Sequence, residues 1–131
     1  MSIAPPLKLK IQLMCGEEAA IGPGKAMVLE AIDRTGAISA AGRELGMSYR
    51  RIWLLVDSMN RCWNDRLVAT SPGGGKGGGA RLTELGRRVL TSFRALEKRA
   101  EVAAQQEDYA SLLDGLRDEP LAATAPSNPR S

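Results

Sequence analysis

A mainly α-helical fold with a small β-sheet is predicted by three features of this 131-residue chain. Two short helical segments flank a glycine-containing turn, a glycine-rich segment separates two short apolar runs, and a long stretch has apolar residues at helical spacing. Together they predict a winged helix-turn-helix with an N-terminal strand and a long C-terminal dimerisation helix. We expect residues 1–83 to form the helix-turn-helix domain, 84–119 the dimerisation helix with a short helical extension, and 120–131 a disordered tail.

The N-terminal strand is predicted at Leu7–Leu13, where apolar and polar residues alternate. A lone strand does not stay exposed, so we expect it to pair with the glycine-rich hairpin and form a three-stranded sheet. Glu17 and Glu18 follow in a predicted loop. Paired carboxylates can perform acid–base chemistry, but without neighbouring pocket residues a solvated loop is the simpler interpretation.

Two helices precede the turn. The first, Gly24–Thr35, has Val28, Leu29 and Ile32 on one face and ends at Gly36. For the second helix, Ser39 is the predicted N-cap and Leu45 the last residue. Gly46 would end it in the left-handed conformation that glycine tolerates.

The third helix is predicted from Tyr49 to about Trp63, with Ser48 as its N-cap. Its buried stripe is expected to be Ile52, Val56, Met59 and Trp63. Arg50 and Arg51 lie in the first turn, at the positive end of the helix dipole, where an exposed cation costs roughly 0.3–1 kcal/mol. An anion in front of this helix, such as a DNA phosphate or a guanine edge, would explain them. Alternatively, both side chains fold back to Asp57 or point into solvent.

A hairpin with a glycine-rich tip follows. Leu67–Thr70 and Ala80–Thr83 read as short strands, and Lys76 is the one charged residue among the glycines between them. Such a wing lets backbone amides approach a phosphate chain closely. A nucleotide-binding phosphate loop is the competing interpretation, but Lys76 is followed by glycine rather than Ser or Thr. A flexible linker is the other alternative interpretation of this glycine-rich segment.

From Glu84 to about Gln106 the pattern is helical. The apolar stripe consists of Leu85, Val89, Phe93, Leu96, Ala100 and Ala103. This narrow stripe fits a coiled-coil seam or packing on the chain's own domain. A helix of about 30 Å is longer than so small a body covers alone, which favours dimerisation. A short helical patch around Tyr109–Leu116 should end near Pro120.

Residues 25–99 resemble the N-terminal DNA-binding domain of the ModE molybdate-responsive regulators and, more distantly, the LysR-type winged helices. The matching segments are 36–41, 46–50, Trp53, 59–60, the wing 74–83 and 86–88. The resemblance implies a homodimeric DNA-binding winged helix that regulates transcription. Full-length members also carry a C-terminal molybdate-binding module. Because this chain stops at Ser131 without such a module, oxyanion sensing is not carried over from the resemblance, and a small-molecule ligand is not expected.

The residues expected to meet DNA come from the third helix and the wing. Arg50 and Arg51 would enter the major groove or hold its rim, while Lys76 and Arg81 would reach phosphates or the minor groove. The full set is Ser48, Tyr49, Arg50, Arg51, Trp53, Lys76 and Arg81. Trp53 could equally be a dimer or core contact.

Charge and composition agree with a DNA-binding protein. The net charge is +3, but residues 1–96 contain 14 Lys and Arg against 8 Asp and Glu, whereas residues 97–131 contain 4 against 7. A solvated surface could give the same balance. With no histidine, Cys15 and Cys62 form no common zinc site, and we expect no metal, cofactor or catalytic set. The sequence has no run of about 18 apolar residues and no basic-then-apolar export signal at its N-terminus, so a cytoplasmic protein without membrane contact is expected. Two rival functions remain: an oxyanion-responsive regulator, and an accessory protein that pairs with a longer regulator.

Overall fold

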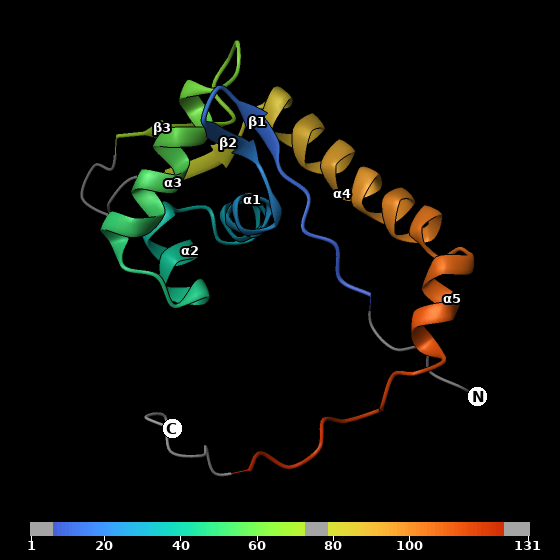
Figure 1. Ribbon diagram of the computed structural model, residues 1–131. Coiled ribbons are helices and arrows are strands. Elements are labelled where there is room, and N and C mark those ends of the chain that lie inside the picture. Colours follow the sequence, from blue (N-terminus) through green and yellow to red (C-terminus); the bar gives the residue numbers. More distant parts are fainter. Residues whose placement is uncertain (1–6, 73–78, 125–131) are drawn as a thin grey trace.

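The computed structural model describes residues 7–72 and 79–124 (Figure 1). Helices dominate these residues, with two small antiparallel sheets of two strands each, which confirms the predicted mainly α fold with a small β component. In chain order the elements are β1 (Leu13–Cys15), β2 (Glu18–Ile21), α1 (Pro23–Thr35), α2 (Ile38–Leu45), α3 (Tyr49–Arg61), β3 (Val68–Ser71), β4 (Gly79–Leu82), α4 (Glu84–Ala104) and α5 (Glu107–Leu113).

Helix α1 lies at the centre of the core. It packs against α2, α3, α4, β2 and β4. Its fully buried residues include Val28, Leu29 and Ile32, as the apolar pattern predicted. Pro23 occupies the first turn, where a missing N–H costs nothing, and Gly36 ends the helix at φ 79°.

A three-residue turn joins α2 to α3. Gly46 ends α2 at φ 70°, in the left-handed conformation that the sequence predicted. The predicted cap of α2 is wrong, because Ala37 is the N-cap and Ser39 already lies inside the helix. The two helices approach closely at Gly42, where a Cβ atom would lie 3.2 Å from Ile52 Cγ2.

The predicted N-terminal strand and three-stranded sheet are both wrong. Residues 7–12 form no strand, and β1 pairs with β2 rather than with the β3–β4 hairpin. Gly16, at φ 60°, is the first residue of a two-residue turn, so Cys15 faces Glu18 directly. Glycine at this position is typical of the type II′ turns that close tight hairpins. Pairing of β1 with β2 closes a loop of two residues, whereas pairing with the β3–β4 hairpin would close a loop of more than 50 residues. The shorter loop costs less conformational entropy.

The β3–β4 pair runs from Val68 opposite Leu82 to Ser71 opposite Gly79, within one residue of the predicted strands. The predicted wing tip, including Lys76, lies outside the described residues. Asn60 ties the end of α3 to this hairpin, because its side-chain oxygen accepts from the Leu67 and Val68 amides at 2.8 and 3.1 Å.

Helix α4 begins at a strong cap and leaves the body of the protein. The Thr83 hydroxyl accepts from the Gly86 amide at 3.0 Å. Val89 and Phe93 are buried against the core, and Figure 1 shows the C-terminal half of α4 running outward to α5. None of the helices within residues 7–72 and 79–124 has the length and apolar character needed to cross a membrane.

Candidate nucleic-acid interface

The N-terminal end of α3 is capped as predicted. The Arg51 amide donates to Ser48 Oγ at 3.1 Å, and Ser48 has the extended backbone of an N-cap. Tyr49, Arg50 and Arg51 follow, all exposed. The first turn of α3 contains no acidic residue. The end of this helix therefore presents two cations, together with the positive end of the helix dipole, to whatever lies in front of it.

The carboxylate that could have neutralised these arginines is already paired. Arg61 Nε donates to Asp57 Oδ2 at 2.9 Å, one turn further along α3. Arg61 also lies 3.3 Å from Glu18 of β2. Hydrogen bonds from Ser58 and Arg61 lower the pKa of Glu18, so this carboxylate stays ionised. The alternative in which Arg50 or Arg51 folds back to Asp57 is therefore not the observed arrangement.

Other acidic side chains are paired away from the front of α3. Arg34 pairs with Glu44, Arg87 with Asp33 at 3.1 Å, and Arg94 with Glu30 at 2.9 Å. Within the described ranges, several arginines of the α2 to β4 region have no ion-pair partner. They are Arg43, Arg50, Arg51, Arg66 and Arg81. Unpaired cations in this region give it an excess of positive charge.

Large exposed side chains lie between these cations. Tyr49 is 59% exposed, Trp53 46% and Leu54 47%. Trp53 is therefore not a core residue, so the interpretation of Trp53 as a core contact is wrong. Leu54 was not predicted as a site residue. Helical periodicity places Leu54 opposite the buried stripe of Ile52, Val56 and Met59. The sequence alone could therefore have identified Leu54 as an exposed apolar residue of this helix.

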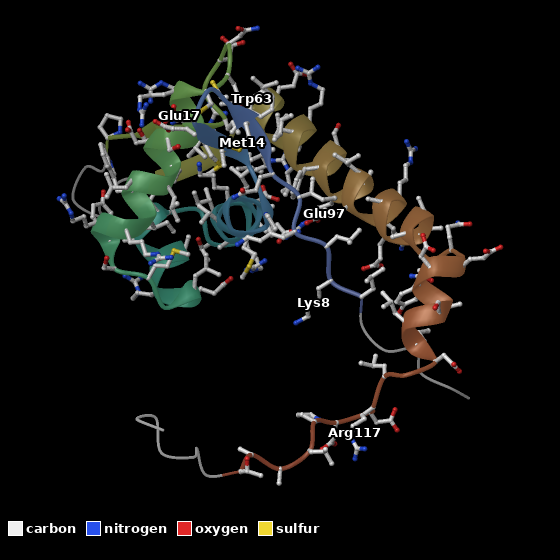
Figure 2. The ribbon with its side chains drawn as sticks, in the orientation of Figure 1. Lys8, Met14, Glu17, Trp63, Glu97 and Arg117 are labelled. Atoms are coloured by element: carbon white, nitrogen blue, oxygen red, sulfur yellow. The ribbon has the colours of Figure 1, made fainter. Side chains whose placement is uncertain are left out.

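Two of the predicted DNA-contacting residues, Arg81 and Lys76, belong to the predicted wing. Arg81 is exposed on β4, opposite Ala69, close to the predicted wing tip. Lys76 is not among the described residues. Trp63, expected in the buried stripe, is only half-buried and donates from Nε1 to the Ala20 carbonyl at 3.2 Å. This hydrogen bond joins the segment after α3 to β2 of the β1–β2 hairpin, in the region where Figure 2 labels Trp63.

The predicted seam of α4 splits into two parts. Val89 and Phe93 are 7% and 4% exposed and belong to the core, with Leu85 packed against it. Leu96, in contrast, is 50% exposed. Further along the helix, Ala100 is half-buried and Ala103 exposed. Leu96, Trp63 and Leu13 also line an open groove of about 1400 Å³ beside α4.

The fold brings the two cysteines together, although they lie far apart in sequence. Cys15 faces Glu18 across the β1–β2 hairpin, and Glu18 contacts Arg61, the neighbour of Cys62. Burial raises the pKa of the Cys62 thiol, and a hydrogen bond with the Cys15 side chain raises it further. In the described part of the chain, no group of three or more His, Cys, Asp or Glu side chains is arranged to hold a metal ion.

Comparison with known proteins relates this chain to molybdenum-linked regulators. No protein-family model matches it. It is 38% identical over 92 residues to the molybdenum-pterin-binding protein MopA of Rhodobacter capsulatus, covering 70% of this chain and 35% of MopA. It is 36% identical over 99 residues to the molybdenum transport protein ModE of Azotobacter vinelandii, covering 76% of this chain and 33% of that protein. Over these residues the chain is similar to MopA and ModE.

A third relative adds a regulatory description. The DNA-binding transcriptional dual regulator ModE of Escherichia coli K12 is 32% identical over 110 residues, which cover 84% of this chain and 39% of that regulator. The chain thus spans about a third of the length of the curated relatives it matches. The names of these relatives describe regulators, a transport protein and a molybdenum-pterin-binding protein, not enzymes.

Proposed function

We propose that this chain is a ModE-related, DNA-binding transcriptional regulator that reads DNA with α3. The observation that carries the proposal is the capped end of α3, where Arg50 and Arg51 are exposed and Asp57, the carboxylate on the same helix, is paired with Arg61. Cations at the positive end of a helix dipole are unfavourable unless an anion compensates them. DNA supplies that anion as phosphate, and it supplies guanine acceptors for arginine in the major groove.

The architecture we propose is a winged helix-turn-helix. Helices α2 and α3, joined by the turn after Gly46, would be the helix-turn-helix, and the β3–β4 hairpin would be the wing. The short α2 would cross the sugar–phosphate backbone while α3 enters the major groove. Arg81, and Lys76 beyond it, would contact phosphates beside the groove. These contacts position the protein, whereas contacts to base edges give sequence specificity.

Dimerisation is the second part of the proposal. The C-terminal half of α4 leaves the body, and its stripe continues there through Leu96, Ala100 and Ala103. We propose that a second copy packs on this segment and on the groove beside it, so that two α3 helices face two half-sites of a palindromic operator. The relatives named for transcriptional regulation support the regulatory role.

The test uses the purified chain alone. A random-sequence DNA duplex library is selected over several rounds, and the affinity for the enriched duplex is compared with that for a scrambled duplex, with and without molybdate. We expect an enriched site with inverted half-sites, an affinity that falls steeply with salt, and no response to molybdate. If no sequence is enriched, the chain alone does not recognise DNA specifically. That result would favour the alternative in which it is an accessory protein that pairs with a longer regulator. A strong molybdate response would favour the oxyanion-responsive one.

A further inference from the structure

The outward face of α3 carries a leucine at its centre. Ile52, Val56 and Met59 are buried, and Leu54 lies on the opposite side with 47% of its surface exposed. Leu54 is four residues after Arg50, so the two side chains occupy the same helix face one turn apart. A single exposed leucine is ordinary in a soluble protein. This one lies one turn after the unpaired Arg50 and one turn before Asp57, whose charge is paired with Arg61, on the helix face that we propose meets DNA.

The neighbours of Leu54 restrict what can cover it. Tyr49 and Trp53 are also exposed, which makes the front of α3 a mixture of apolar surface and positive charge. Arg50 and Arg51 have no acidic partner among the residues that the structure describes. A surface that combines these two properties complements a polyanion that also presents small apolar groups. The major groove of DNA is such a surface, because each thymine displays its C5-methyl group there.

We infer that Leu54 is a specificity-determining residue that packs on a thymine methyl group in the operator. The inference rests on the proposed DNA-binding function and deepens it by naming the base. The thymine should lie within a few base pairs of the position contacted by Arg50, because the two side chains share one face of α3. Arginine would select guanine by hydrogen bonding, and Leu54 would select thymine by apolar contact.

The experiment removes the methyl group from the DNA rather than from the protein. In the duplex enriched by selection, each thymine is replaced singly by deoxyuridine, which pairs identically but has no C5-methyl group. Affinity is measured with the full chain by fluorescence anisotropy. The affinity of unmodified protein should fall about fourfold when deoxyuridine replaces thymine at one position in each half-site. This change corresponds to the free energy of burying about one methylene group. The other thymines should tolerate the replacement.

Variants of Leu54 then assign the effect. Leu54→Ala should bind the thymine duplex several-fold more weakly and no longer distinguish thymine from deoxyuridine at that position. Leu54→Met, which keeps the apolar contact, should retain most of the discrimination. Leu112→Ala on α5, where the leucine is 72% exposed, is the matched control and should change neither affinity nor discrimination. Melting temperature is measured for each variant, and the deoxyuridine series on unmodified protein stands even if one variant folds poorly.

The outcomes separate the inference from the function on which it rests. If no sequence is enriched, the proposed DNA-binding function fails. If a site is enriched but unmodified protein tolerates deoxyuridine everywhere, only the Leu54 assignment is overturned. It is also overturned if Leu54→Ala keeps the same discrimination at the same position. Unchanged DNA binding of Leu54→Ala with loss of a protein partner would assign this face to that partner instead.

Discussion

The guanidinium of Arg94 on α4 makes a two-point contact with the carboxylate of Glu30 on α1. Arg94 Nε and Nη2 each donate to a Glu30 oxygen at 2.9 Å, and Nη1 donates to Glu97 at 2.7 Å. The contact ties the long helix to the central helix of the core, just beyond the buried Phe93. It therefore fixes the direction in which α4 leaves the body.

This contact makes stability depend on pH. The hydrogen bond from Arg94 lowers the pKa of Glu30 in the folded state. The stabilisation is therefore fully present at pH values above the pKa of a glutamate in the unfolded chain, which is about 4.3. It is lost as the pH falls through the lower pKa that Glu30 has in the folded protein. Because both side chains are about a third exposed, we expect Glu30→Gln to cost roughly 0.5–1 kcal/mol near neutral pH.

Thermal melts of unmodified protein and Glu30→Gln at several pH values check this. The difference in melting temperature should be largest near neutral pH and shrink in acid. Glu101→Gln, an exposed substitution on the same helix, is the control and should show no such trend. A constant difference across the whole pH range would reject the linkage.

Gly86 should tolerate no side chain. A Cβ atom there would lie 2.1 Å from the Leu67 carbonyl oxygen, a backbone atom that the Thr83 amide also contacts at 2.9 Å. Gly86→Ala must displace α4 or the backbone at Leu67, just before β3, and we expect a loss of roughly 1–3 kcal/mol in unfolding free energy. Gly24→Ala is the matched control, because its Cβ meets nothing within 4 Å, and it should be neutral or stabilising. Equal denaturation midpoints for the two variants would refute the close approach.

Leu96→Arg should separate the proposed dimer. The substitution places a charge in the apolar stripe beyond the core, where the side chain is 50% exposed in a single chain. Sedimentation at micromolar concentration should show a dimer for unmodified protein and a monomer for the variant, with similar melting of secondary structure. Ala95→Arg, exposed on a different face of α4, is the control and should remain dimeric. A monomeric unmodified chain would disprove dimerisation.

The two thiols should differ in reactivity. Cys15 is exposed, whereas burial raises the pKa of Cys62 and reduces its thiolate fraction at neutral pH. We expect maleimide to modify Cys15 first, and the rate at Cys62 to keep rising with pH. Peptide mapping by mass spectrometry measures both rates. Faster modification of Cys62 at neutral pH would contradict the observed environment.

Local signals in the sequence predicted most helix ends correctly. The glycines at positions 36 and 46 end helices in the left-handed conformation, and Ser48 caps α3, because each of these effects depends only on nearby backbone. The alternation at Leu7–Leu13 misled the prediction, since apolar alternation says that a segment is half-buried but not which strand it pairs with. The Gly16 turn carried that information.

Contacts between distant segments were harder to predict. Neither the Arg61–Glu18 contact nor the meeting of the two cysteines follows from spacing alone, because each depends on how the β1–β2 hairpin docks on α3. The Arg61–Asp57 pair, in contrast, has the i,i+4 spacing of an ion pair within one helix. The exposure of Leu54 did follow from helical periodicity, but an apolar residue opposite the core was not considered as a site residue.

Reading of DNA by the end of α3 is the central claim, and the double variant Arg50→Ala, Arg51→Ala tests it most directly. The measurement is the ratio of affinities for the selected duplex and a scrambled duplex, with Arg99→Ala on α4 as the control. Loss of even one arginine contact to a base should reduce this ratio by roughly fivefold to more than a hundredfold, because such a contact is worth about 1–3 kcal/mol. The melting temperature should stay the same or rise slightly, since two unfavourable cations leave the helix end. An unchanged ratio together with a lower melting temperature would show that the two arginines are structural, and would contradict the account.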